Sequence, residues 1–398
     1  MKKIFMLLIM ILFLVGCNLN NNETKIDNTL TGIDKKIEDK LSNMTLDEKI
    51  GQMLIIFYRS PNFDNTLKDS LNTVKPGGFI LFSENITTYA DTLEFIKKVK
   101  STSDIPMLIS IDQEGGNVQR LLALKDMEVS NIPYMNYVGA TEDALYSKEV
   151  GKVIAEELRV FGINMDFAPV IDVYSNPNNT VIGKRSFSSD PEIVSKMGLS
   201  LAEGLNENGI IPVYKHFPGH GNTSVDSHVA LPIVTKAKNE LYQLDLIPFK
   251  DAIKSKNGLI MVGHLAVPAI TKDNTPASLS KALITDFLKG EMGYDGLVIT
   301  DALNMGALTK YYTQEEIYLR AIEAGVDLLL MPSSSKEALS TIKQAVENGR
   351  ISEERIDESV RKILKLKYEK VNDNYDEYLP SSYLNSEEHQ KVLSKIQG

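Results

Sequence analysis

The sequence contains no tryptophan, only five histidines and a single cysteine, Cys17. One cysteine excludes an intramolecular disulfide and a metal cluster held by several thiolates. Without tryptophan, a ligand ring has only tyrosine and phenylalanine to stack on. Basic residues are outnumbered, since 43 Lys and Arg face 53 Asp and Glu, which gives a formal net charge of −10. No long basic run follows residue 3, so nucleic-acid binding has little support.

The remaining composition is that of an ordinary globular protein. Of the 398 residues, 43% are hydrophobic and 24% are charged. These values exclude disorder, a coiled coil and a polytopic membrane protein as the main class. The length allows one large α/β barrel or two smaller domains.

The N-terminus has the features of an export signal. Two lysines precede an unbroken run of 12 apolar residues, Ile4 to Val15, which is too short to span a membrane. The following Gly16-Cys17 resembles the cleavage site of a bacterial lipoprotein. We therefore expect a signal peptide at 1–16, a lipidated Cys17 that begins a flexible tether at 17–34, and an anchor on the extracellular face of the cell membrane.

Eight apolar segments of strand length follow the tether, and amphipathic segments of helical period separate most of them. Nearly continuous apolar strands are typical of a parallel sheet that is buried on both faces. The alternation predicts a single (β/α)₈ barrel over 35–372, followed by a tail at 373–398. A doubly wound open sheet is the alternative, and the absence of G-x-G-x-x-G after the first strand disfavours it. The eight predicted strands are Met53–Tyr58, Gly78–Phe82, Met107–Ile111, Met165–Val173, Ile211–His216, Leu259–Leu265, Leu297–Thr300 and Val326–Met331.

Polar residues at the ends of the third and fourth strands are candidates for ligand binding, because barrel enzymes carry their chemistry there. Asp112 follows the third strand, and Gly115-Gly116 allows a tight turn that brings Arg120 back toward the barrel mouth. The alternative is a structural Asp–Arg pair. Arg185 lies in the long loop after the fourth strand and is expected to point inward, or else to be a solvated loop residue.

The fifth strand and the loop after it hold the densest signal, because three of the five histidines fall in Lys215-His216 to His228. Asp226 and His228 are two residues apart, so an extended backbone places them on one side. A carboxylate that orients an imidazole makes His228 a plausible proton shuttle. Zinc bound by His216, His220, His228 and Asp226 is a rival interpretation, although the spacing matches no established metal pattern. A structured loop with solvated histidines is a second alternative.

Two further polar residues follow the next strands. His264 is expected to support the site or to be a hydrogen-bonded core histidine. Asp301 ends an apolar strand, and a carboxylate at that depth must pair with a cation, bind a ligand or attack it.

Together these segments resemble family 3 glycoside hydrolases, and within them the β-N-acetylglucosaminidases. The resemblance covers roughly residues 45–370. Its most specific part is KHFPGHG followed by DSH, at 215–221 and 226–228, and IDQEGG at 111–116 and ITDALNM at 299–305 agree with it in order and spacing.

The resemblance implies a role for each matching residue. Asp301 matches the catalytic nucleophile, His228 the acid/base and Asp226 the partner that orients it. Five residues match sugar-binding positions: Asp112, Arg120, Arg185, Lys215 and His216. The expected reaction is retaining hydrolysis of a terminal β-linked N-acetylglucosamine through a covalent intermediate, with no metal or organic cofactor. Activity is expected to peak near the imidazole pKa, about 6.5. The expected substrate is a glycan such as a peptidoglycan fragment.

Three alternatives stay open at the level of sequence. The protein could be a phosphorylase of the same family, since a histidine acid/base repels phosphate less than a carboxylate does. It could be a β-glucosidase of that family, or a sugar-binding lipoprotein without activity. Catalysis by the substrate's own acetamide is disfavoured, because Asp301 is followed by Ala302 rather than by a second acid. The oligomeric state is not predicted.

Overall fold

The computed structural model describes residues 32–223, 226–227, 229–372 and 374–396. The predicted signal peptide, Cys17 and most of the tether lie outside these residues. Within the described chain, no helix combines the length and the apolar character needed to cross a membrane.

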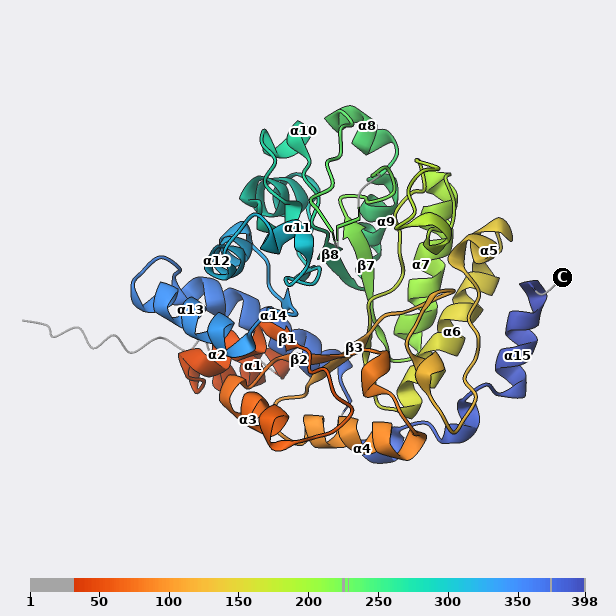
Figure 1. The fold of residues 1–398 in the computed structure, drawn as a ribbon, viewed down its shortest axis with the longest axis horizontal. Coiled ribbons are helices and arrows are strands. Elements are labelled where there is room, and N and C mark those ends of the chain that lie inside the picture. Colours follow the sequence, from red (N-terminus) through yellow and green to blue (C-terminus); the bar gives the residue numbers. More distant parts are fainter. Residues whose placement is uncertain (1–31, 224–225, 228, 373, 397–398) are drawn as a thin grey trace, which may run out of the picture.

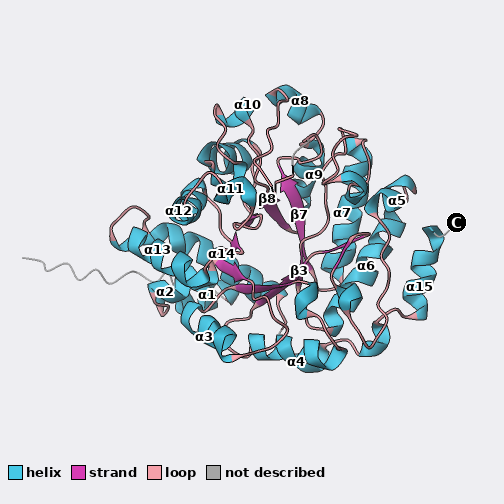
Figure 2. Ribbon diagram, in the orientation of Figure 1, coloured by secondary structure: helices cyan, strands magenta, loops and turns pink. Residues whose placement is uncertain are grey.

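Eight parallel strands form the centre of the molecule, with helices around them (Figures 1 and 2). The strand order is β10-β1-β2-β3-β6-β7-β8-β9, and a parallel bridge between Ile299 and Leu328 joins the two ends into a ring. The predicted (β/α)₈ barrel is therefore confirmed, and the open-sheet alternative is wrong. The strands are β1 (Leu54–Ile56), β2 (Gly78–Leu81), β3 (Leu108–Ile111), β6 (Met165–Asp166), β7 (Ile211–Phe217), β8 (Leu259–Val262), β9 (Val298–Thr300) and β10 (Leu329–Leu330). An antiparallel hairpin, β4 (Gln113–Gly115) with β5 (Val118–Gln119), follows β3.

The outer layer consists mainly of the helices that connect the strands. Its longer members are α3 (Asn65–Val74), α4 (Tyr89–Lys100), α6 (Ala144–Val160), α7 (Pro191–Glu207), α8 (Lys238–Gln243), α9 (Ile247–Ser255), η5 (Ala282–Glu291), α12 (Gln314–Ala324) and α13 (Ser335–Glu347). At the N-terminus, α1 (Ile33–Ser42) and α2 (Leu46–Gln52) pack against α14 (Glu353–Lys370). Near the C-terminus, α15 (Glu387–Leu393) packs against α6.

Helices α6 and α7 pack closely because glycines face the partner backbone. A Cβ on Gly151 would lie 2.2 Å from the Leu201 carbonyl oxygen, and one on Gly204 would lie 2.1 Å from that of Lys148. The start of α7 is fixed by Asp190, whose carboxylate accepts the Glu192 N–H, and by Pro191 in the first turn. This pair of helices covers the part of the barrel that carries β6 and β7.

Two segments differ from the sequence expectation. The predicted strand Met165–Val173 is regular only at Met165–Asp166, because Pro169 has no N–H for the ladder; beyond it, Ile171 N–H still donates to the Lys215 carbonyl. The amphipathic segment 238–255, whose period predicts one helix between the fifth and sixth strands, is two helices, and Pro248 lies in the first turn of the second.

Asn164 ties the N-terminal end of β6 to β3. Its Oδ1 accepts the Ile109 N–H at 2.9 Å, and its Nδ2 donates to the Met107 carbonyl at 2.9 Å. We expect Asn164→Ala to lower the free energy of unfolding by about 2–4 kcal/mol, because two buried backbone groups lose their partners. Urea denaturation measures the change. Asn257→Ala, at a partly exposed position, is the control, and equal small effects for both variants would contradict this account.

Candidate active site

A cavity of about 180 Å³ opens at the C-terminal ends of the strands, where barrel enzymes place their catalytic groups. Six residues predicted from the sequence line it: Asp112, Arg120, Arg185, Lys215, His216 and Asp301. The loop after β7 contributes His220 and Ser227 to the wall. Asp226 is a described residue but is not among the cavity-lining ones, and His228 lies outside the described residues. The expectation that His228 and Asp226 form a pair therefore stays a prediction.

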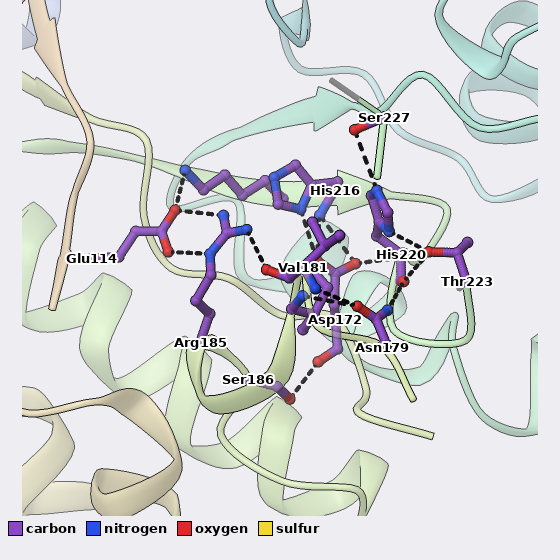
Figure 3. Close-up of polar contacts among 12 residues, drawn as sticks. Glu114, Asp172, Asn179, Val181, Arg185, Ser186, His216, His220, Thr223 and Ser227 are labelled. Carbon is purple, nitrogen blue, oxygen red and sulfur yellow. Dashed lines mark hydrogen bonds and ion pairs between the residues drawn. The ribbon is translucent and has the colours of Figure 1, made fainter. Parts of the chain in front are cut away.

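Lys215 is the centre of a chain of alternating charges. This residue of β7 is buried, and its ammonium donates to Asp112 Oδ1 at 2.7 Å and to Glu114 Oε1 at 2.6 Å. On the far side of Glu114, Arg185 donates through Nε at 2.7 Å and through Nη2 at 2.8 Å (Figure 3). Burial alone would raise the pKa of Glu114, but Arg185 and Lys215 hold that pKa far below its usual range. The carboxylates likewise raise the pKa of Lys215 despite its burial, so these groups stay charged.

Arg120 reaches the same cavity through the β4–β5 hairpin. Gly115 and Gly116 adopt positive φ values of 105° and 58°, which glycine tolerates and which turn the chain back as predicted. The Arg120 guanidinium lies over the Phe82 ring at 5.2 Å and 3.7 Å from Asp112 Oδ2. The prediction that Arg185 points inward also holds, because the short helix η3 (Gly183–Arg185) directs it to Glu114 rather than to solvent.

Asp172 organises the opposite side of the site. It is fully buried. Its carboxylate pairs with the ring Nδ1 of His216 at 2.7 Å, and it accepts hydrogen bonds from the backbone N–H of His216 at 3.2 Å and of His220 at 2.6 Å. Burial would raise the pKa of Asp172, but His216, His220 and these donors lower it. Asn179 completes the arrangement, because its Nδ2 donates to the His220 carbonyl at 2.8 Å. One carboxylate thus fixes both the ring of His216 and the start of the loop after β7.

The ring of His220 contacts two residues farther along the loop after β7, Thr223 and Ser227. Its Nδ1 pairs with Thr223 Oγ1 at 2.6 Å, and its Nε2 lies 3.4 Å from Ser227 Oγ (Figure 3). Burial and the neighbouring His216 lower the pKa of His220. The Ser227 carbonyl accepts the Ala307 N–H at 3.0 Å, which ties the loop to the segment after β9.

Asp301 follows β9 and faces the cavity. Its Oδ1 accepts the Ala302 N–H at 2.7 Å. Burial would raise the pKa of Asp301, but His264, His216 and that N–H lower it, so the group is a carboxylate at neutral pH. His264 is a buried, hydrogen-bonded histidine that is not among the cavity-lining residues: its ring pairs with Ser278 Oγ at 2.7 Å and with the Ala302 carbonyl at 2.9 Å. A supporting role for this residue stays a prediction.

No three His, Cys, Asp or Glu side chains of the described chain lie together in a way that could hold a metal ion. In the zinc alternative, His216 and His220 would be two of the ligands. The Nδ1 atom of each already pairs with Asp172 or Thr223, and His228 is outside the described residues.

Sequence reasoning did not assign roles to Glu114, Asp172 and Asn179. Glu114 stands in the quoted IDQEGG, but nothing local shows that it, rather than Asp112 alone, pairs with Lys215. Asp172 could have been identified from the sequence. Like Asp301, it is a carboxylate within an apolar run, here Val170 to Val173, and a buried carboxylate needs a partner. Asn179 lies in a polar loop and has no such signal.

We expect Asp172→Asn to lower the free energy of unfolding by about 3 kcal/mol at pH 7, because a buried charge network loses its anion. The carboxylate has a lowered pKa in the folded state, so its contribution to stability is fully present above the unfolded value of about 3.9 and is lost progressively as the pH falls from that value to the folded-state pKa. Denaturation at pH 7 and at pH 3.5 should therefore show a smaller difference at the lower pH. Glu358→Gln, at an exposed position, is the control; a difference that does not depend on pH would contradict this assignment.

Comparison with known proteins agrees with this geometry. The model of the glycosyl hydrolase family 3 N-terminal domain matches residues 45–366. β-Hexosaminidase A of Pseudoalteromonas piscicida is 31% identical over 89% of this chain, which spans 66% of that relative's length. β-Hexosaminidase LpqI of Mycobacterium tuberculosis is 32% identical, with 80% of this chain and 82% of that protein covered. A solved family 3 β-N-acetylglucosaminidase from Paenibacillus sp. FPU-7 is 38% identical with a TM-score of 0.84, over 89% of this chain and 68% of that one. This chain belongs to glycoside hydrolase family 3.

Proposed function

We propose that the protein is a retaining β-N-acetylglucosaminidase that removes terminal, non-reducing β-linked N-acetylglucosamine. The observation that carries the proposal is the position of Asp301, a carboxylate in the same cavity as the fixed charges around Lys215. Charged groups held in one geometry suit the recognition of sugar hydroxyls, and a free carboxylate beside them suits attack on the anomeric carbon. The names of the relatives, β-hexosaminidase and β-N-acetylglucosaminidase, support the amino sugar as substrate.

The reaction proceeds in two displacements. Asp301 attacks the anomeric carbon and forms a glycosyl ester, while His228, oriented by Asp226, protonates the departing oxygen. His228 then removes a proton from water, which attacks the same carbon and releases Asp301. Two inversions give net retention. Because His228 must hold a proton in the first step and accept one in the second, activity peaks near the imidazole pKa, about 6.5.

The proposed location follows from the N-terminal segment. A lipid on Cys17 and a tether at 17–34 hold the barrel at the extracellular face of the membrane. At that location, the substrates that carry β-linked N-acetylglucosamine are glycans released from the cell wall. Lipid attachment is tested by metabolic labelling with an acyl analogue, which should mark the wild type and not Cys17→Ala.

Replacement of Asp301 by asparagine tests the nucleophile. We expect kcat/KM on a chromogenic β-N-acetylglucosaminide to fall at least about 10³-fold, a loss of about 4 kcal/mol of transition-state stabilisation, in a variant whose circular dichroism spectrum is that of the folded wild type. The wild type should turn over this substrate and not the matching β-glucoside. Asp286→Asn, at an exposed position of η5, is the control and should keep wild-type activity. Activity in Asp301→Asn, or turnover of the glucoside alone, would contradict the proposal.

Variants of the loop test the acid/base. For a substrate with a poor leaving group, Asp226→Asn and His228→Ala should lose about 10²–10⁴-fold in kcat/KM. For a dinitrophenyl glycoside the loss should be much smaller, because that leaving group departs without protonation. The acidic and alkaline limbs of the pH profile should flatten in His228→Ala. An equal loss on both substrates would assign these residues to folding or binding instead.

Phosphorolysis is the second candidate. A β-glucoside phosphorylase, BglX, superposes on this chain with a TM-score of 0.82 at 25% identity, and a histidine acid/base admits an anionic acceptor more readily than a carboxylate does. Product analysis with and without phosphate separates the two reactions. Free N-acetylglucosamine in both cases supports hydrolysis, and a sugar 1-phosphate that forms only with phosphate supports phosphorolysis.

A further inference from the structure

Asp166 is a buried carboxyl group beneath the sugar-binding charges. It ends β6, pairs in register with Ile111 of β3, and is 0% exposed. Its Oδ1 accepts the Gln113 N–H at 2.9 Å. Gln113 stands between Asp112 and Glu114, the two partners of Lys215. Asp166 therefore holds the backbone from which both of these carboxylates project.

The second carboxyl oxygen of Asp166, Oδ2, has no hydrogen-bond partner among the described residues. A charged oxygen left alone in the interior is costly. The same Gln113 also fixes the other strand of the hairpin, because its Oε1 accepts the Arg120 N–H at 2.8 Å. The position of Asp166 thus bears on Asp112, Glu114 and Arg120 together.

Three charged groups face Asp166 from the elements around it: Asp112 at the end of β3, Glu114 on β4 and Lys215 on β7. The single ammonium already contacts both carboxylates. A third negative charge would compete for Lys215 and repel the other two. Burial, Asp112 and Glu114 raise the pKa of Asp166 to about 8, although Gln113 N–H and Lys215 act in the opposite direction.

We propose that Asp166 is a positioning residue that works as a neutral carboxylic acid, and that its ionisation disrupts the Asp112–Lys215–Glu114 arrangement and weakens sugar binding. The proposal rests on the proposed function, because it assumes that these charges bind the sugar. It adds a pH limit that does not involve the catalytic histidine. Binding is full while Asp166 is protonated and is lost as the pH rises through its folded-state pKa.

The test is the affinity for N-acetylglucosamine, measured by NMR titration between pH 6 and pH 9.5, since binding needs no turnover. Wild-type affinity should be constant up to pH 7 and about tenfold weaker one pH unit above the pKa of Asp166. Asp166→Asn, which keeps the neutral shape, should bind at pH 6.5 within a few-fold of wild type and keep that affinity at pH 9. Asp286→Asn, the control defined above, should show the wild-type fall.

The same fall in Asp166→Asn as in wild type would overturn the proposal. If that variant does not fold, the side-chain carboxyl ¹³C shifts of aspartate-labelled wild type decide. A carboxyl assigned to Asp166 that stays protonated at pH 7 supports the proposal, and titration of that carboxyl below pH 5 overturns it. If N-acetylglucosamine does not bind at pH 6.5, the proposed function fails, and the carboxyl titration still gives the ionisation of Asp166.

Discussion

The site depends on one buried ammonium. Lys215 is taken out of water by the barrel wall, and a lone charge there would be strongly destabilising. Its pairing with Asp112 and Glu114 removes that cost and draws three chain segments together, since Glu114 in turn binds Arg185 in a bidentate pair. The strand β7, the β4–β5 hairpin and the loop with η3 are therefore joined through Lys215, Glu114 and Arg185, with the Glu114 carboxylate bound to both cations. Removal of the Glu114 carboxylate would take one partner from Lys215 and the carboxylate partner from Arg185.

On the other side of the cavity, a buried negative charge is likewise stabilised by the groups that contact it. There the buried charge is the anion Asp172, and its donors are the ring and backbone of His216 and the backbone of His220. Lys215 and His216 are consecutive on β7, so this strand carries one member of each network. The two networks hold the cavity walls in place. Asp301, which faces the space between them, remains available for chemistry because a neighbouring N–H and two histidines stabilise its charge.

Much of the fold could be predicted from the chain alone. Eight apolar runs of strand length that alternate with amphipathic segments predicted the barrel, because they indicate eight parallel strands buried on both faces, and no G-x-G-x-x-G follows the first strand to favour an open sheet. The rule that barrel sites lie at the carboxyl ends of strands then selected Asp112 and Asp301, and the resemblance to family 3 glycoside hydrolases implied Lys215 and His216; all four line the cavity. The glycine pair before Arg120 indicated correctly that the chain turns back.

What the sequence did not indicate is how these groups are paired. Glu114 and Asp166 take their roles from residues on other strands, and a pairing between β3, β6 and β7 leaves no local pattern. The end of the regular strand at Asp166 could have been expected, because Pro169 lies within the predicted strand and has no N–H for the ladder. The roles of His228 and Cys17 stay predictions, because both residues lie outside the described chain.

The central claim is that Asp301 forms a covalent bond to the sugar. Incubation with a fluorinated N-acetylglucosaminyl fluoride, which slows release of the intermediate, followed by mass spectrometry of the proteolysed protein, tests it most directly. The account predicts one added glycosyl mass on the peptide that contains Asp301, absent in Asp301→Asn. An enzyme that turns over its substrate but carries the label on a different residue, or never carries it, would contradict the account.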